Sequence, residues 1–366
     1  MLAEALASVA GDMLSIKVFS TTEAGRDPYT LNGVEVVPSY ERGAASYSRL
    51  LDVLAEHGGV DVLHLQHEFG IYGDTPAIIE ALLEARAERL TRAAVATLHT
   101  VYHPRGVEKG LETRLSLYER SFLLDSIVVH SVLQEFELAS QGAPLERLHR
   151  IPHGTSINSY VETPRQKLIE LLGLPGELQR ARVLAVPGFL RRDKGLATLL
   201  EAFSKVDDPA ARLVVAGEPQ GRGSEEVARL LEEYEAREPR LVVLRRYLSS
   251  REVLYLSALA DLIVLPYEDR PGKYSVSGIL HLSMGSLKPI VGTRVPRLVE
   301  LYQLAPRMVV RPRSPGELAA KIRWVLQNYD ETIPYMGQVY SYAVRTMWPR
   351  MARRHLSLYQ SLLAAS

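Results

Sequence analysis

Apolar residues recur along this chain in two alternating patterns. Short runs rich in valine, isoleucine and leucine, typical of buried strands, alternate with longer segments whose apolar positions follow a helical period. The predicted strands are Ser15–Phe19, Val34–Pro38, Val60–Gln66, Ala93–His99, Ser126–His130, Leu148–Pro152, Arg182–Val186, Arg212–Ala216, Leu241–Leu244, Leu262–Pro266, Pro289–Val291 and Met308–Val310. The clearest helical patterns cover Leu2–Val9, Leu196–Val206, Ser224–Glu235 and Pro315–Asn328.

This alternation predicts an α/β fold in which helices cover both faces of parallel sheets. The strands are too many for one ordinary open sheet, so two doubly wound domains fit better than one. A TIM barrel is the alternative, but it needs eight strand–helix repeats in one closed sheet. Thr163-Pro164 marks a crossover, so we expect domains at 1–163 and 164–332. We expect the helical tail at 333–366 to return to the first domain, the alternative being a helix packed on its own domain.

The start of the chain is unusual for such a domain. The amphipathic segment Leu2–Val9 precedes the first predicted strand, whereas a doubly wound domain begins with a strand and a loop. We therefore expect the first strand of the first domain, with its loop, to be missing.

Composition narrows the class of protein further. The 43 basic and 43 acidic residues balance, which argues against nucleic-acid binding through bulk charge. Cysteine is absent, which excludes disulfides, zinc–thiolate sites and cysteine nucleophiles. Without a membrane-length apolar run or a signal peptide, a cytoplasmic location is the default expectation. Scarce asparagine beside plentiful glutamate and arginine suggests a thermophilic source.

Histidines follow several predicted strands of the first half. His67 with Glu68, then His99, His130 and His153, stand at successive strand ends, where open α/β sheets bind ligands. Each could instead be an ordinary packed histidine. His64 and His67 are three apart on a strand and so point to opposite faces, which argues against a shared metal ion. No metal site is predicted.

Two loops of the second half could bind anions. In GFLRRDKG, Gly188 ends a strand, and a basic loop with Arg191, Arg192 and Lys194 precedes a helix, a pattern typical of phosphate sites. A solvated basic turn is the alternative interpretation. The spacing fits neither a Walker A loop nor a dinucleotide fingerprint.

The second loop is GKYSVSGILHLSMGSLKPIVGT. Ser275 or Ser277 can cap a helix that begins near Gly278, leaving free amides in its first turn. No carboxylate occurs from Gly272 to Thr293. The two loops together suit a diphosphate.

In their order, GFLRRDKG, LVVAGEP, VLYLSALADLIVLPY and the S-x-S-G loop before KPIVGT resemble the second domain of the retaining family-4 glycosyltransferases, which have the GT-B fold. HEFGIYG, TLHTVYHP, VVHS and IPHG resemble the first domain of that group. The likeness extends over nearly the whole chain. It implies two Rossmann-like domains facing a central crevice, and transfer of a sugar from a nucleotide-diphosphate donor to an acceptor with retained anomeric configuration.

The resemblance also implies roles by position. His99 matches a histidine beside the donor sugar, Lys194 matches the lysine that neutralises the diphosphate, and Arg191 or Arg192 can assist it. The remaining positions implied for the donor are Gly188, Tyr247, Glu268, Tyr274, Ser275, Val276, Ser277 and Gly278. Those implied for the acceptor side are His67, Glu68 and Gly70.

Three departures from the family pattern bear on these roles. Phe189 stands where the family often has an arginine, and the paired glutamates fall on Tyr274 and Leu282. The third departure is the missing first strand. Retaining transfer is thought to use the leaving diphosphate as the base, so donors without a carboxylate still suit it. Hydroxyl contacts could then come from Tyr274, Ser275, Ser277, His281 or Glu268.

The departures leave two alternatives open: a catalytically inactive GT-B scaffold or partner subunit, and another GT-B enzyme such as a sugar-nucleotide epimerase or a phosphorylase. The expected partners are a nucleotide sugar and a sugar, lipid or small-molecule acceptor, with no cofactor or metal. The tail WPRMARRHLSLY suggests peripheral membrane contact or, as the alternative, a solvated helix face.

Overall fold

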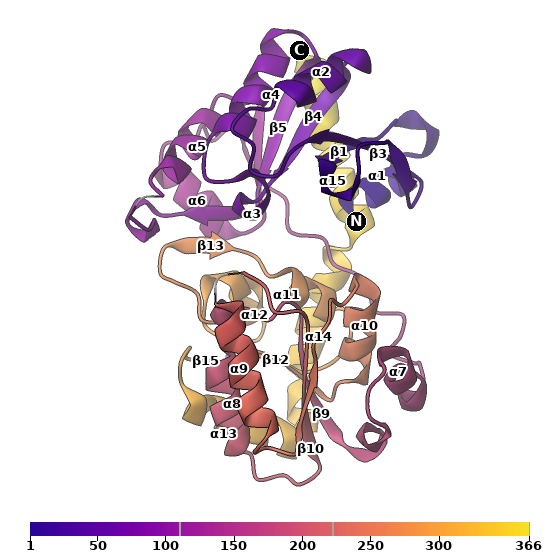
Figure 1. Cartoon of the computed structure of the whole chain (residues 1–366), viewed down its shortest axis with the longest axis vertical. Helices are drawn as coiled ribbons and strands as arrows, with labels where there is room; N and C mark the ends of the chain where they lie inside the picture. Colours follow the sequence, from indigo (N-terminus) through magenta and orange to yellow (C-terminus); the bar gives the residue numbers. More distant parts are fainter. Residues whose placement is uncertain (110, 222, 366) are drawn as a thin grey trace. The chain divides into compact units, whose positions relative to one another are not determined.

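The computed structural model describes residues 1–109, 111–221 and 223–365. The chain divides into two compact units (Figure 1). Unit 1 comprises Met1–Gly154, Arg270–Val276 and Trp348–Ser366, and unit 2 comprises Thr155–Asp269 and Ser277–Met347.

Unit 1 is built on a parallel sheet in the order β4-β5-β7-β8. Its strands are β4 (Val60–His67), β5 (Thr91–Leu98), β7 (Ser126–Val129) and β8 (Leu148–Arg150). A smaller sheet contains β1 (Lys17–Thr21), β3 (Val34–Tyr40) and β2 (Tyr29–Leu31). The helices of this unit are α1 (Leu2–Ala10), α2 (Ser48–Glu56), α3 (Phe69–Tyr72), α4 (Ala77–Ala87), α5 (Thr113–Ser121), α6 (Val132–Ser140) and α15 (Trp348–Ala365).

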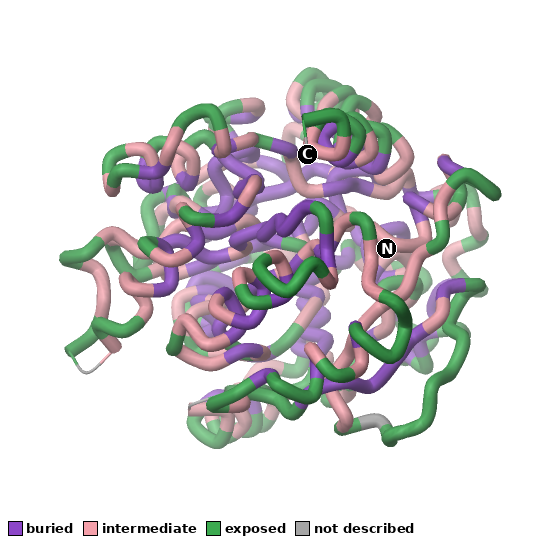
Figure 2. The backbone as a smooth tube through the Cα atoms, turned by 90° about the horizontal axis from the view of Figure 1, so that it is seen from above, coloured by how far each residue is buried: buried purple, intermediate pink, exposed green. Residues whose placement is uncertain are grey.

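The core of unit 1 lies on both faces of β5, whose residues are buried except for Arg92. The buried stretches of the chain follow the central strands, and the exposed residues gather on outer helices and turns (Figure 2). On one face, Val95 and Val128 pack with Met351 and Leu358 of α15. Helix α1 packs on α15 in turn, so these helices form an outer layer.

A short antiparallel pair brings a distant segment into unit 1. Strand β13 (Lys273–Ser275) pairs with β6 (Thr100–Tyr102), although the chain before Arg270 and after Val276 belongs to unit 2. The sequence pattern did not predict either strand, because three residues are too few to show a period.

Unit 2 is a six-stranded parallel sheet in the order β11-β10-β9-β12-β14-β15. The strands are β9 (Arg182–Pro187), β10 (Ala211–Ala216), β11 (Leu241–Leu244), β12 (Leu262–Leu265), β14 (Ile290–Thr293) and β15 (Val309–Val310). The helices are α7 (Arg165–Leu172), α8 (Leu196–Ser204), α9 (Ser224–Glu235), α10 (Ser250–Leu259), α11 (Gly278–Ser283), α12 (Val299–Leu304), α13 (Pro315–Gln327) and α14 (Tyr329–Arg345). Helices α8, α9 and α13 lie on one side of the sheet, and α7 and α10 on the other (Figure 1).

The α/β class with helices on both sides of parallel sheets is confirmed. Each parallel sheet is open, which excludes the barrel alternative. The unit boundaries differ from the predicted domain limits at three points. The first stretch of unit 1 ends at Gly154 rather than at position 163, and Arg270–Val276, inside the predicted second domain, belong to unit 1. Helix α14 stays with unit 2, where Val339 and Ala343 join the core. Of the predicted returning helices at 333–366, α15 is the one that belongs to unit 1.

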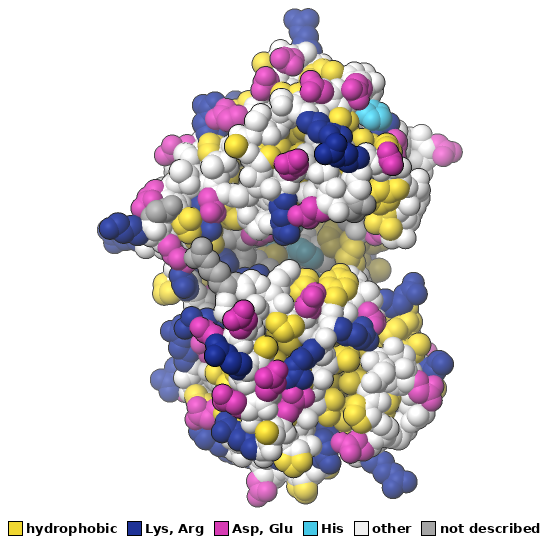
Figure 3. Space-filling view, in the orientation of Figure 1, with side chains coloured by type: hydrophobic (Ala, Val, Ile, Leu, Met, Phe, Trp, Pro, Cys, Tyr) yellow, Lys and Arg dark blue, Asp and Glu magenta, His cyan; other side chains and the backbone are white. Residues whose placement is uncertain are grey.

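Basic and acidic side chains are interspersed on the visible faces of both units, as the balanced charge leads one to expect (Figure 3). Within the described ranges, no helix combines the length and the apolar character needed to cross a membrane.

Candidate functional site

The first predicted phosphate loop follows the carboxyl end of β9. Gly188 has φ +100°, and a Cβ at this position would lie 2.7 Å from Cδ1 of Ile279 in α11. Glycine is therefore required both by the backbone conformation and by the close approach of that helix. The loop and the start of α11 thus lie next to each other at the same edge of the sheet of unit 2.

The turn after Gly188 packs against the segment that follows β12. Gly195 begins α8 with φ +65°, and a Cβ there would lie 1.9 Å from the carbonyl oxygen of Pro266. The amide of Glu268 donates to the carbonyl oxygen of Asp193 at 3.0 Å. These contacts place Lys194 beside Tyr267.

A buried arginine holds the acidic groups of this turn. Arg297 contacts Asp193 at 2.6 Å and also binds Asp269. Burial opposes ionisation of Asp193, but Arg297 and Arg191 outweigh it and hold the pKa of this carboxyl below its usual range. Burial likewise opposes the charge of Arg297, and its two carboxylate partners raise its pKa. The sequence showed no pattern that marked Arg297, because its partners lie in two separate loops.

The three predicted cations of the loop have different partners. Arg191 forms an ion pair with Asp193 at 3.2 Å, which neutralises it locally. The side chain of Arg192 is 80% exposed, and its partner Glu226 is 3.8 Å away. Lys194 Nζ lies 3.9 Å from the ring centre of Tyr267. Within the described part of the chain, no carboxylate lies at ion-pair distance from Lys194, so its charge is available for an anion.

Ser277 rather than Ser275 caps α11. The Ser277 hydroxyl accepts from the amide of Leu280 at 3.1 Å. Ser275 instead lies in β13, opposite Thr100, and is buried in unit 1. The predicted donor loop is therefore divided, with Tyr274, Ser275 and Val276 in unit 1 and Ser277 and Gly278 in unit 2.

Two further predicted donor residues lie at this edge of unit 2. Tyr247, which is 59% exposed, packs near Phe189, which is 37% exposed, with ring centres 5.8 Å apart. Glu268 accepts from Thr198 at 2.5 Å and from Arg313 at 3.1 Å. The aromatic pair thus presents exposed ring surface, whereas both carboxylate oxygens of Glu268 are engaged.

In unit 1, His99 lies in a row of hydrogen-bonded side chains. Its Nε2 is 3.0 Å from Oε1 of Gln66, and its Nδ1 is 3.3 Å from Nε2 of His130. His130 Nδ1 in turn faces the carbonyl oxygen of Ile151 at 2.8 Å. The ring of His130 also meets that of His153 edge to face, with centres 5.3 Å apart.

The carbonyl of Ile151 constrains the protons in this row. A carbonyl only accepts, so Nδ1 of His130 donates to it; with a neutral His130 ring, Nε2 then accepts from Nδ1 of a neutral His99. Burial, followed by the proximity of His153, lowers the pKa of His99 to about 4, so His99 is neutral near pH 7. In that arrangement Nε2 of His99 needs a donor, which Gln66 would supply if its amide oxygen and nitrogen, now facing His99 and His64 respectively, were interchanged.

The row continues to the tail helix. His64 contacts Gln66 at 3.1 Å and the hydroxyl of Thr97 at 2.8 Å through Nε2, and the hydroxyl of Tyr359 at 2.5 Å through Nδ1. If Tyr359 donates to His64, every later bond can run in the same direction, ending at the carbonyl of Ile151. Both ring nitrogens of His99 are used within unit 1, so a ligand hydroxyl could bind one only by replacing a present partner.

The predicted acceptor-side residues are spread over different environments. His67 is fully buried between Phe69 and Tyr72, and its ring nitrogens have no hydrogen-bond partner among the described residues. Burial, and then His99, lower its pKa to about 3. Glu68 accepts from Thr100 at 2.9 Å, and the carbonyl of Gly70 accepts from Arg42 at 2.8 Å.

His64 and His67 contact different neighbours, His64 those of α15 and His67 those of α3, as their odd spacing on β4 predicts. Among the residues that the structure describes, no group of three or more histidine, aspartate or glutamate side chains is arranged to hold a metal ion.

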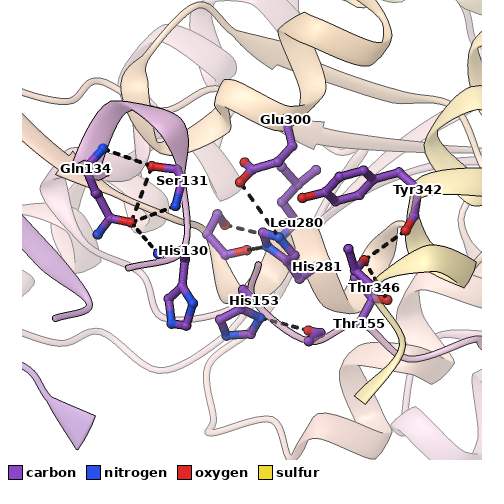
Figure 4. Close-up of polar contacts among 12 residues, drawn as sticks. His130, Ser131, Gln134, His153, Thr155, Leu280, His281, Glu300, Tyr342 and Thr346 are labelled. Carbon is purple, nitrogen blue, oxygen red and sulfur yellow. Dashed lines mark hydrogen bonds and ion pairs between the residues drawn. The ribbon is translucent and has the colours of Figure 1, made fainter. Parts of the chain in front are cut away.

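Figure 4 shows two other polar groups at element ends. Ser131 and Gln134 form a capping box at the start of α6, and Gln134 also donates to the carbonyl of His99 at 3.0 Å. Glu300 faces His281, whose Nδ1 contacts the carbonyl of Ser277 at 2.9 Å. The contact of Gln134 with His99 and that of Glu300 with His281 could not be predicted from the sequence, since each joins separate elements.

Comparison with known proteins finds a family match over part of the chain and similar folds over most of it. Residues 180–328 match the family model described as Glycosyl transferases group 1. A search of curated proteins found no match. The sucrose-phosphate synthase of Thermosynechococcus elongatus aligns over 100% of this chain and 92% of its own, with a TM-score of 0.76 and 18% identity.

Two further solved structures are similar. Alr3699/HepE of Anabaena, in complex with UDP, aligns over 86% of this chain and 82% of its own, with a TM-score of 0.70 and 18% identity. An E. coli trehalose-6-phosphate structure bound with UDP-2-fluoro glucose aligns over 94% of this chain and 91% of its own, with a TM-score of 0.68 and 13% identity. At these identities the likeness shows the fold alone. The chain therefore has the GT-B fold, and residues 180–328 carry the match to the group 1 glycosyl transferases.

Proposed function

We propose that this protein is a glycosyltransferase that moves a sugar from a nucleotide-diphosphate donor to an acceptor with retained configuration. The observation that carries the proposal is Lys194: a lysine at the carboxyl edge of a parallel sheet, held by an aromatic ring, with no carboxylate partner in the described chain. The match of residues 180–328 to group 1 glycosyl transferases, and similar structures solved with UDP or a UDP sugar, support it.

For unit 2, the proposal assigns the diphosphate to Lys194, with Arg192 as the second cation. Arg191 is a weaker choice because Asp193 neutralises it. Gly188 allows close approach of the ligand to the backbone. In unit 2 the backbone amides of Ser277 and Gly278 would bind phosphate and sugar oxygens; Ser275 and Val276, to which the proposal gives the same role, belong to unit 1.

The exposed rings of Tyr247 and Phe189 would stack on the base, and Glu268 and Tyr274 would contact hydroxyl groups of the donor. For unit 1, we assign His99 to positioning the donor sugar, and His67, Glu68 and Gly70 to the acceptor side. His67 is buried, so it would act through packing beneath the acceptor rather than by contact.

The proposed step needs no carboxylate base. The bond from the anomeric carbon to the donor diphosphate breaks, and a bond from the acceptor oxygen to the same carbon forms on the same face. The acceptor proton passes to the leaving diphosphate oxygen, which acts as the base. Lys194 stabilises the negative charge that develops on that diphosphate. The proposal includes no metal or cofactor.

One observation favours a non-catalytic scaffold as the second candidate function. The two glutamate positions of the family are Tyr274 and Leu282, and Glu268, the nearest alternative in the sequence, is engaged by Thr198 and Arg313. A scaffold would bind a nucleotide sugar without turning it over. An epimerase would change the sugar without needing an acceptor.

Thermal melting against UDP, GDP, ADP and their sugars tests the proposal, because a ligand that binds the native state raises the melting midpoint. We expect one base to stabilise the wild type and to lose its effect in Lys194→Ala. Lys167→Ala, which alters an exposed lysine of α7, is the matched control and should respond like the wild type. No midpoint shift with any nucleotide would overturn the proposal.

Turnover separates the candidates once the base is known. We expect the protein to release the nucleoside diphosphate from sugar nucleotides of that base. NMR of the sugar product should show that the anomeric configuration of the donor is retained. Binding without turnover would favour the scaffold, and a changed sugar still attached to its nucleotide would favour the epimerase.

A further inference from the structure

Tyr267, the second residue after β12, is a buried residue that contacts the proposed diphosphate lysine. Its side chain is 1% exposed. Its ring centre lies 3.9 Å from Nζ of Lys194 and 5.1 Å from Cζ of Arg297. Its hydroxyl lies 3.1 Å from the hydroxyl of Ser277. One ring is therefore in contact with the loop after β9, the cap of α11 and the buried arginine.

The position of this ring is fixed from several sides. The Tyr267 carbonyl accepts from the hydroxyl of Thr293 at 2.6 Å, which ties its backbone to β14. Ser277, its hydroxyl partner, is itself held by the amide of Leu280. Arg297 cannot move away without breaking its contacts with Asp193 and Asp269. The ring of Tyr267 is therefore fixed in position. The contact forms because the flexible side chain of Lys194 places its ammonium over that ring.

The kind of partner matters for the charge of Lys194. A carboxylate at the same place would hold the ammonium but would cancel its charge, as Asp193 does for Arg191. An aromatic face attracts the ammonium through the ring quadrupole and leaves the net charge in place. A positioned cation of undiminished charge is what a site for a developing anion needs, because no reorganisation is then required during the reaction.

We propose that Tyr267 is a positioning residue for the donor diphosphate: its ring holds the ammonium of Lys194 in place without neutralising it, while its hydroxyl, bonded to Ser277, holds the ring. This inference rests on the proposed function, since it assigns the diphosphate to Lys194. It goes beyond that function by naming the side chain that positions the ammonium of Lys194. The competing explanation is that Tyr267 merely fills the core of unit 2 and that the contact with Lys194 is incidental.

A double-mutant cycle separates these explanations. Tyr267→Leu removes the ring, Tyr267→Phe keeps the ring and removes the hydroxyl, and each is made in the wild type and in Lys194→Ala. The measured quantity is the Kd of the wild-type and variant chains for inorganic pyrophosphate and for UDP, GDP and ADP, by calorimetry. We expect Tyr267→Leu to weaken diphosphate binding by roughly threefold to thirtyfold in the presence of Lys194 and to have no further effect in Lys194→Ala. Tyr267→Phe should retain most of the affinity.

Phe203→Leu is the matched control, because Phe203 is a fully buried ring of α8 in the same unit with a cation, Arg240, 4.7 Å from its centre. It should lower the melting midpoint without changing the diphosphate Kd. Should Tyr267→Leu prove unfolded, Tyr267→Met, whose longer and more flexible side chain adapts better to the shape of the space, replaces it in the cycle.

Three outcomes would count against the inference in different ways. Equal weakening by Tyr267→Leu with and without Lys194 would show a purely structural role, and unchanged affinity in every Tyr267 variant would show no role at all. Both leave the proposed function intact. A wild-type chain that binds neither pyrophosphate nor any of the diphosphates would overturn the proposed function together with the inference.

Discussion

At the scale of single residues, the state of His99 depends on neighbours that are distant in sequence. Gln66 and His130 occupy its two ring nitrogens at 3.0 and 3.3 Å. Burial opposes the charged ring, and its pKa falls to about 4. Because the folded-state pKa is lowered, the stabilising effect of neutral His99 is complete above the unfolded value, near pH 6.5, and is lost as the pH falls toward about 4.

Gln66→Glu should make the protonated ring of His99 more favourable. A carboxylate at Gln66 can only accept, and it would favour a second proton on the ring of His99. We expect the pKa of His99 to rise by about 1 to 3 pH units, measured by NMR titration of the ring nitrogens. Gln66→Leu, which removes the amide without adding charge, should leave the pKa low. An equal rise in both variants would contradict the hydrogen-bond directions deduced here.

At the scale of elements, α11 and α12 meet through a buried acid and a buried histidine. Nε2 of His281 and Oε1 of Glu300 are 4.0 Å apart, a distance that would suit an ion pair if both were charged. Burial, however, lowers the pKa of His281 to about 4 and raises that of Glu300 to about 7. Both shifts favour the neutral forms, so both groups are neutral between about pH 4 and about pH 7.

Glu300→Gln should therefore make unit 2 more stable at alkaline pH. Since the folded-state pKa of Glu300 is raised from 4.5 to about 7, native-state stability falls as the pH rises through that interval. The neutral amide avoids this loss, which amounts to up to about 3 kcal/mol. Melting curves at about pH 5 and about pH 8 should show a gain for the variant only at the higher pH. The titration of His281 affects both proteins and cancels in the comparison. A gain in melting midpoint that is the same at both pH values would contradict the raised pKa of Glu300.

At the scale of the whole molecule, the chain leaves unit 1 twice and returns twice, and α15 is its last return. Gly154 ends the first stretch of unit 1, and the ring of Trp348 at the start of α15 occupies the space beside it. A Cβ on Gly154 would lie 2.1 Å from that ring. The docking of the tail helix thus depends on a glycine nearly two hundred positions earlier in the sequence.

Gly154→Ala should destabilise unit 1 by about 1–3 kcal/mol, because the added methyl overpacks against Trp348. Calorimetric unfolding should show a lower midpoint for the transition of unit 1. Gly337→Ala is the matched control: a Cβ at Gly337, inside α14, meets nothing within 4 Å. It should raise the midpoint of unit 2, since alanine favours helix by about 0.5–1 kcal/mol over glycine. An unchanged midpoint for Gly154→Ala would mean that the ring of Trp348 does not occupy the space beside Gly154.

The sequence by itself determined the succession of strands and helices and the fold class, because periodicity and turn residues act locally. It also placed Gly188 and Lys194 at a strand end and a capping serine before α11, since these depend on neighbours within a few positions. The pairing of β6 with β13 and the division of the donor loop after Val276 had no local signal. Tertiary structure alone decided that Lys194 lies on the ring of Tyr267, whereas the ion pair of Arg191 with Asp193 joins residues only two positions apart. The contact of Lys194 with Tyr267 depends on segments brought together by the sheet, and no local pattern records the distances among them.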